Sequence, residues 1–216
     1  MTPDVPSKLR DAIKRDLRPA RPLRPPLVRA LVLIPIAVAI VLSVPGLRFF
    51  RSDMAALGVL KAWGFSFGQA LAGLLIVAVA LRESIPGRGL SRGAAAATFA
   101  VGLVLPFALL VVTASAFDVG PGPGRALEEG IGCFRVSAIS AIPALIAAAW
   151  LAARALPMRP ALAGALYGLG CGLIADAGLR LFCEYTVPSH VLFGHGGGII
   201  AAMVVGATVA KTIQRR

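Results

Sequence analysis

The sequence predicts an all-α, polytopic membrane protein: a bundle of six transmembrane helices preceded by a short basic segment. The composition supports this fold class, because 57% of the 216 residues are hydrophobic and only 15% are charged. Soluble domains usually carry about 25% charged residues. The mean hydropathy of +0.82 comes from long apolar runs. Each run approaches the roughly 20 residues that an α-helix needs to cross a bilayer.

Six apolar runs divide the chain into three parts. We expect residues 1–27 to lie outside the membrane, residues 28–210 to form the six-span domain, and residues 211–216 to form a basic tail. Pro106 lies inside the third run and Pro143 inside the fourth, which predicts a kink in each. The predicted spans are Val28–Val44, Leu60–Leu81, Ala94–Ser115, Val136–Leu156, Leu162–Phe182 and Val191–Ala210.

The N-terminal segment has two halves of different character. In the first half, Val5, Leu9, Ile13 and Leu17 recur at helical spacing among charged residues, which indicates an amphipathic helix of about three turns. The second half, residues 18–26, contains four prolines and is expected to be extended. A helix this short is marginal alone in water, so the segment is suited to folding on a partner.

Lysine and arginine are unevenly distributed between the two sides of the predicted membrane domain. Sixteen of the 22 fall on the side that carries both chain ends, and six fall on the other side. Loops rich in Lys and Arg stay in the cytoplasm, so both termini are predicted to be cytoplasmic. The net charge of +12 is then mostly a topology signal, and we expect no direct contact with nucleic acid.

Two polar islands interrupt the apolar pattern. The larger, residues 181–195, holds Cys183, Glu184, His190 and His195, and the smaller surrounds Cys133. Polar and ionisable groups at a membrane are costly unless they have a function there. The predicted topology puts both islands at the outer face, because Cys133 opens the fourth span and Cys183 closes the fifth.

Three interpretations of Cys133 and Cys183 remain open from the residues alone. They could be unrelated interfacial thiols, or they could form a disulfide in the oxidising space outside the membrane. They could also be soft ligands for a thiophilic metal ion, with His190, His195 or Glu184 completing the coordination sphere. Cys171 lies about 18 Å deeper at 1.5 Å per residue and is expected to act as a small buried hydrophobe.

Asp176 and Arg180 lie four residues apart in the fifth span, in the order that favours an ion pair within one helix. The alternative is a small ion-coupled transporter or channel that uses Asp176, Arg180 and the histidines. Transporters usually place polar residues on several spans near the midplane, and few occur here. Hydrolase, zinc-protease and P-loop motifs are missing from the sequence, so we expect no enzyme, and no cofactor beyond transient binding of a thiophilic metal ion.

Several short motifs occur in an order that resembles one family. They are Asp16-Leu17-Arg18-Pro19, Leu23-Arg24-Pro25-Pro26, Gly132-Cys133-Phe134, Leu156-Pro157-Met158-Arg159-Pro160, Phe182-Cys183-Glu184, and Pro188-Ser189-His190 followed by His195. Together with six spans and a basic N-terminus, they resemble the NrsF-type anti-sigma-factor family of bacterial inner-membrane proteins. The resemblance covers essentially the whole chain.

This resemblance implies an anti-sigma factor that holds an extracytoplasmic-function sigma factor at the membrane and releases it on stress. The paired cysteines of the family are associated with sensing heavy-metal or oxidative stress, and they correspond to Cys133 and Cys183. We expect the sigma factor to bind residues 1–27. The lipid bilayer is the other expected partner of the chain, and this basic segment could also contact it. The predicted contact residues are Leu9, Ile13 and Leu17 on the apolar face, with Arg18, Arg21 and Arg24 against an acidic surface.

Overall fold

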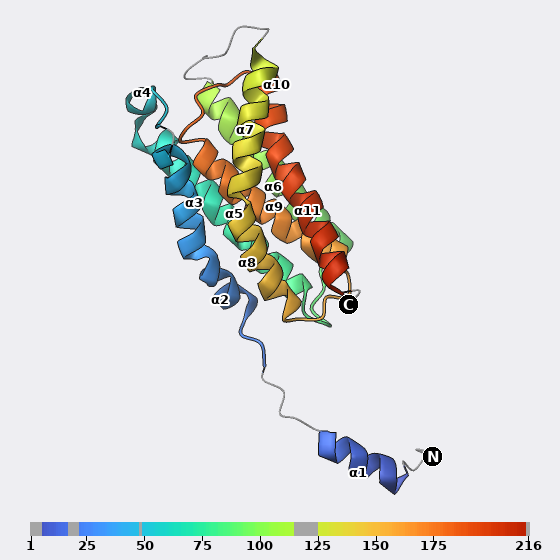
Figure 1. The fold of residues 1–216 in the computed structure, drawn as a ribbon. Helices are drawn as coiled ribbons and strands as arrows, with labels where there is room; N and C mark the ends of the chain where they lie inside the picture. Colours follow the sequence, from blue (N-terminus) through green and yellow to red (C-terminus); the bar gives the residue numbers. More distant parts are fainter. Residues whose placement is uncertain (1–5, 17–21, 48, 115–124, 215–216) are drawn as a thin grey trace.

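The computed structural model describes residues 6–16, 22–47, 49–114 and 125–214, and Figure 1 shows their arrangement. The predicted all-α class is confirmed: the described residues form helices and connecting loops without any strand. Six helical segments are long and apolar enough to cross a membrane. The protein is therefore a multi-pass membrane protein.

The first helix, α1 (Ser7–Asp16), precedes the six spans. Most spans are interrupted by a short 3₁₀ or π-helical turn or by a break. The spans are α2 (Pro26–Ala30) with α3 (Ile34–Leu47); α4 (Met54–Val59) with α5 (Phe65–Glu83); α6 (Arg92–Ala114); α7 (Ala126–Ser140) with α8 (Ile142–Ala153); α9 (Pro160–Leu179); and α10 (Pro188–His190) with α11 (Gly197–Gln214).

The start of the second span, the start of the fourth and the end of the sixth differ most from those expected. The second span begins at Met54 rather than at the predicted Leu60. The fourth span begins at Ala126, ahead of the predicted Val136, so Cys133 lies inside a helix rather than at its mouth. The acidic first turn of α7 favours this early start, because carboxylates stabilise the positive end of the helix dipole. The sixth span continues to Gln214, so the predicted tail of residues 211–216 starts within a helix. Hydropathy alone places a boundary where polar residues begin, although the helix can continue.

The central element is α9, which the other spans surround in Figure 1. Every residue from Leu166 to Leu179 is buried, and α9 packs along its length against α5 on one side and α11 on the other. Its many glycines and alanines allow this, because small residues let helix backbones approach closely in a bilayer. The Tyr167 hydroxyl adds a 2.8 Å hydrogen bond to the carbonyl of Gly206 in α11.

Gly164 and Gly168 show how close this packing is. A Cβ atom at Gly164 would collide with the carbonyl oxygen of Gly206, and one at Gly168 would collide with that of Ala202. The sequence Gly164–Gly168 is thus a packing motif between α9 and α11.

Gly168→Ala should therefore destabilise the membrane domain. The added methyl group has to displace the backbone of α11, and overpacking of this kind costs about 1–3 kcal/mol. The matched control is Gly68→Ala in α5, where a Cβ atom would meet nothing within 4 Å. The midpoints of thermal unfolding in detergent would test this. A Gly168→Ala midpoint equal to that of Gly68→Ala would contradict the packing described.

The two ends of the bundle carry different features. We call the end at which α2 begins and α11 ends the lower end, as drawn in Figure 1, and the opposite one the upper end. At the lower end, the Arg159 guanidinium donates to both carboxylate oxygens of Glu83, at 2.8 and 2.9 Å, and to the carbonyl of Leu90 at 2.7 Å. These bonds fix the segment between α8 and α9 to the turn between α5 and α6.

Candidate metal and thiol site

Four potential metal ligands converge at the upper end of the bundle. They are Cys133, Cys183, His190 and His195, and their ligand atoms all lie within 4.8 Å of one another. All four side chains are buried. Cys133 comes from α7, Cys183 from the loop after α9, and the two histidines from the start of the sixth span. The site therefore joins three segments that are far apart in the sequence.

The turns that follow α9 place Cys183 beside α7. Its amide N–H donates a 2.7 Å hydrogen bond to the carbonyl of Leu179, the last residue of α9. On the facing side, Gly130 and Gly194 let α7 approach the sixth span closely. A Cβ atom at Gly194 would lie 3.0 Å from the Gly130 carbonyl oxygen and 3.1 Å from the Cβ of Cys133. A larger residue at 194 would push these segments apart at the site.

A π-helical turn aligns the two histidines. In an α-helix, residues five apart point about 140° away from each other, given 3.6 residues per turn. Residues Val191–Gly196 instead form a π-helical turn, in which each backbone bond spans five residues. His190 and His195 therefore lie on the same side of the span, with ring centroids 5.8 Å apart.

The distances between the potential ligands match a tetrahedral thiolate–imidazole site. With metal–sulfur bonds of about 2.3 Å and metal–nitrogen bonds of about 2.0–2.1 Å, tetrahedral angles separate two sulfurs by about 3.8 Å and a sulfur and a nitrogen by about 3.5 Å. The Sγ atoms of Cys133 and Cys183 are 3.6 Å apart. The Nε2 of His190 lies 3.2 Å from Sγ of Cys183. Little movement would be needed to close the four groups around one ion.

A second layer of buried polar groups holds His195. Its Nδ1 lies 2.7 Å from Oδ1 of Asp176, and Nε2 of Gln69 donates a 2.7 Å hydrogen bond to Oδ2 of the same carboxylate. The Nε2 of His195 is buried and has no hydrogen-bond partner. A carboxylate on one ring nitrogen and a free second nitrogen is the usual arrangement of a metal-binding histidine. Asp176 and Gln69 thus orient His195 from α9 and α5.

The electrostatic setting favours a thiolate at Cys183. The hydrogen bond donated by the Cys133 thiol holds the pKa of Cys183 well below its usual range, against the effect of burial, and the hydrogen bond to His190 acts in the same direction as Cys133. The thiolate is the form that binds metals and reacts with oxidants. A small cavity of about 20 Å³ adjoins Asp176, Cys183 and His195. Such a volume holds about one water-sized particle.

Other predicted site residues lie outside this cluster. The Glu184 carboxylate accepts a 2.6 Å hydrogen bond from the Ser52 hydroxyl and is not among the converging ligands. Asp176 and Arg180 attract each other electrostatically, but the carboxylate contacts His195 and Gln69, and the Arg180 guanidinium donates to Thr113 at 3.1 Å. Cys171 is fully buried in the core, as expected.

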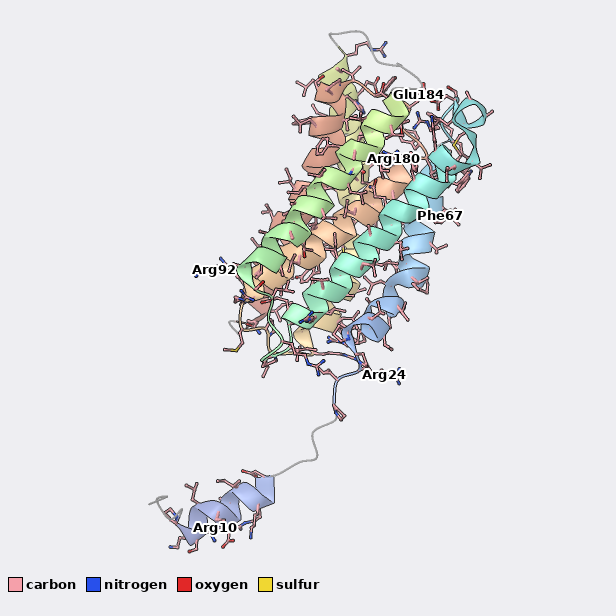
Figure 2. All side chains as sticks on the ribbon, turned by 180° about the vertical axis from the view of Figure 1, so that it is seen from behind. Arg10, Arg24, Phe67, Arg92, Arg180 and Glu184 are labelled. Carbon is pink, nitrogen blue, oxygen red and sulfur yellow. The ribbon has the colours of Figure 1, made fainter. Side chains whose placement is uncertain are left out.

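The predicted sigma-factor-binding residues fall partly within the described chain. Leu9 and Ile13 lie on α1 and are 53% and 50% exposed. Arg24 is exposed just before α2 and is labelled in Figure 2. Leu17, Arg18 and Arg21 lie outside the described residues. The helix α1 therefore presents an unburied apolar face, as the helical spacing predicts.

The contacts that Gln69 and Asp176 make at the site are not predicted from the sequence. Gln69 stands out there only as one of the few polar residues in the spans, and the helical spacing pairs Asp176 with Arg180. The signal that could have found their contact is that Gln69, Asp176 and His195 are strongly polar residues inside three different spans. Buried polar groups need partners, and such residues satisfy each other when their helices are adjacent.

The comparisons with known proteins agree with the resemblance described above. A family model named NrsF, negative regulator of sigma F, matches residues 14–215. No curated protein and no solved structure matches the chain. The matched region includes all six spans and all four residues of the metal and thiol site. The chain belongs to the NrsF family, the negative regulators of sigma F, and its partner is therefore a sigma factor.

Proposed function

We propose that this protein holds an extracytoplasmic-function sigma factor at the bacterial inner membrane and releases it when a thiophilic metal ion binds at the upper end. The observation that carries the proposal is the convergence of Cys133, Cys183, His190 and His195 within 4.8 Å. Two thiolates and two imidazoles suit borderline or soft divalent ions such as Zn²⁺ and Cd²⁺. When bound, the ion would join α7, the loop after α9 and the sixth span through metal–ligand bonds, in addition to their hydrogen bonds.

The proposed orientation puts the upper end outside and both termini in the cytoplasm. It is supported by the sixteen basic residues on the termini side against six on the other. The sensing residues would then face the periplasm, where stress arrives first, and α1 would face the cytoplasm, where the sigma factor is found.

Reporter fusions test this orientation directly. A reporter that is active only in the periplasm should be active when it is fused after Glu129 and inactive when it is fused after Arg216. A reporter that is active only in the cytoplasm should show the opposite pattern. Activity of both fusions on the same side would exclude six spans with cytoplasmic termini.

Coupling between the ends would run through α9. Ligation would draw Cys183, which follows α9, towards Cys133 on α7 and the histidines of the sixth span. Because α9 is packed tightly against α5 and α11, a tilt at its upper end is transmitted to its lower end, where Arg159 is bonded to Glu83. A coupling free energy of about 1–3 kcal/mol changes affinity about 5- to 150-fold, which is enough for a switch.

Oxidation of the thiol pair is a second candidate input. It is favoured by the 3.6 Å separation of the two Sγ atoms, which is about 1.5 Å more than a disulfide bond length. Hydrogen peroxide would accept the two electrons. The Cys183 thiolate attacks one peroxide oxygen, the O–O bond breaks, hydroxide leaves and Cys183 becomes a sulfenic acid. The Cys133 thiol then attacks the sulfur of Cys183, and its proton leaves with the sulfenic hydroxyl as water when the disulfide forms. The product would tie α7 to the same loop.

Titration of the purified full-length protein with Cd²⁺ separates these inputs. If the site binds metal, the wild type should bind one equivalent of Cd²⁺ and show thiolate-to-metal charge-transfer absorbance. Cys133→Ser should not show this absorbance. Oxidant without metal should produce a disulfide if the second candidate holds. Wild-type protein that neither binds Cd²⁺ nor forms the disulfide would overturn the proposed input.

Asp176→Asn should weaken Cd²⁺ binding while both thiols stay in place. The amide cannot match the charge that holds His195, and the loss of a group that supports a metal ligand typically lowers affinity roughly 10- to 100-fold. Asp53→Asn is a suitable control, because Asp53 pairs with Arg51 at the same end of the bundle and is not part of the cluster. An unchanged affinity in Asp176→Asn would remove Asp176 and His195 from the site.

A further inference from the structure

A second site of different chemistry lies at the lower end, on the face formed by α2 and α8. A groove of about 410 Å³ opens there between the start of the first span and the end of the fourth. Its lining combines guanidinium groups with apolar side chains. The lining residues are Pro22, Leu23, Arg24, Val28, Arg29, Val32, Trp150, Leu151 and Arg154.

Arg29 is the unusual member of this lining. The residue is 6% exposed, although it carries a permanent positive charge. One nitrogen, Nη2, donates to the carbonyl of Leu151 in α8. The other, Nη1, is buried without a hydrogen-bond partner. An unpaired buried polar group costs free energy, and more so when it is charged, so an acceptor bound at Nη1 would stabilise this arrangement.

Arg154 adds a second positive charge to the same groove. Its guanidinium lies over the ring of Trp150, 3.6 Å from the ring centroid, and it repels the charge of Arg29. Among the described residues, no carboxylate lies within salt-bridge distance of Arg24, Arg29 or Arg154. Three guanidinium groups therefore line one groove without a counter-charge, which favours an anion.

The surroundings of the groove identify the kind of anion. Val28, Val32 and Trp150 continue the lining into the apolar part of the bundle. Trp150 also lines a second groove, which has a slightly larger volume of about 450 Å³ and runs between α8 and α11. This second groove is lined almost wholly by apolar residues, including Ile146, Val205 and Ile213. A phosphate at Arg29 and Arg154 would thus lie next to surfaces that suit acyl chains.

We propose that Arg29, Arg154 and Arg24 bind the phosphate group of an anionic phospholipid, with an acyl chain along Trp150. Basic pockets between spans at a membrane surface commonly bind such headgroups, and arginine is well suited to phosphate because its planar guanidinium donates two parallel bonds. Leu23 and Arg24 precede the first span directly, so the bound lipid also fixes the start of the segment that leads to α1.

The fluorescence of Trp150 reports on this site. The chain contains two tryptophans, so Trp63→Phe leaves Trp150 as the single tryptophan in the full-length protein. In detergent, short-chain phosphatidylglycerol should give a saturable change. Short-chain phosphatidylcholine, which is zwitterionic, should bind at least about fivefold more weakly, given about 1 kcal/mol per basic group near an anionic headgroup. Inorganic phosphate at the same concentration should give no saturable change in fluorescence.

Arg154→Gln is the test variant and Arg92→Gln its control. Both arginines are exposed at the lower end, and Figure 2 labels Arg92 on the far side of the bundle from Arg24. Removing one basic group near the surface should raise the apparent Kd for phosphatidylglycerol about fivefold in Arg154→Gln and less than about twofold in Arg92→Gln. The Kd values are compared rather than amplitudes, because Arg154 itself contacts Trp150.

Native mass spectrometry of the same variants provides an independent readout. At one lipid concentration, wild type and Arg92→Gln should retain a larger fraction of the phosphatidylglycerol adduct than Arg154→Gln does. The proposal is overturned if Arg154→Gln and Arg92→Gln weaken binding equally, since that indicates diffuse surface charge. It is also overturned if phosphatidylcholine binds as tightly, or if inorganic phosphate alone reproduces the response.

Discussion

Replacing either Cys133 or Cys183 with serine should abolish release of the sigma factor on exposure to Cd²⁺, while repression without stress stays intact. Each change removes one of the two thiolates, and a serine hydroxyl is a poor ligand for a soft ion. The loss of metal affinity should exceed the roughly 10- to 100-fold cost of removing a group that only supports a ligand. A reporter gene controlled by the sigma factor measures repression in the absence of metal and release of the sigma factor in the presence of Cd²⁺.

Cys171→Ser is the matched control for this prediction. Cys171 lies on α9 in the centre of the core, away from the cluster, and a serine hydroxyl within a helix can bond a carbonyl of the preceding turn. This variant should respond to Cd²⁺ as the wild type does. A normal response in both Cys133→Ser and Cys183→Ser, or a lost response in Cys171→Ser alone, would refute a sensor built on the thiol pair.

Changing Leu9 and Ile13 together to serine should release the sigma factor constitutively. Both side chains are about half exposed on α1, and no residue of α1 is buried, so this apolar face is free to dock. Losing the two contacts should cost about 2 kcal/mol of binding free energy, roughly 30-fold in affinity. A pull-down of the sigma factor by the membrane-embedded protein measures the loss.

Asp11→Ser provides the control on the opposite face of α1, with the same residue type introduced. Binding of the sigma factor should be nearly unchanged in this variant. A coarser version of the test deletes residues 2–17, which should free the sigma factor and leave the protein in the membrane. Repression that continues after the deletion would exclude the N-terminal segment as the docking site.

The fold class could be predicted because hydropathy depends on composition along the chain. Six runs of spanning length are visible without any knowledge of packing, and the described part of the structure contains six such spans. Two of the three interpretations open from the residues bring Cys133 and Cys183 together, because an alternating topology places the ends of neighbouring spans at one face. The Sγ atoms of Cys133 and Cys183 lie 3.6 Å apart, so the two thiols are neighbours, and their role in sensing stays a prediction.

The contacts of Asp176 could not be predicted in the same way. They depend on how α5, α9 and the start of the sixth span are rotated about their axes, and a helix that is apolar all round offers no amphipathic pattern from which to read that rotation. The π-helical turn at Val191–Gly196, which brings His195 to the same side as His190, likewise has no marker in the composition. The buried state of Arg29 is hidden for a similar reason, because in the sequence its charge counts only as a topology signal.

The affinity of the sigma factor for the purified protein, measured with and without Cd²⁺, tests the central claim most directly. The full-length protein in a lipid nanodisc is titrated with fluorescently labelled sigma factor, and Cys133→Ser is measured in parallel. The account predicts that Cd²⁺ raises the wild-type Kd at least about fivefold and leaves the Kd of Cys133→Ser unchanged. A wild-type Kd that does not respond to Cd²⁺, or an equal rise in Cys133→Ser, would contradict it.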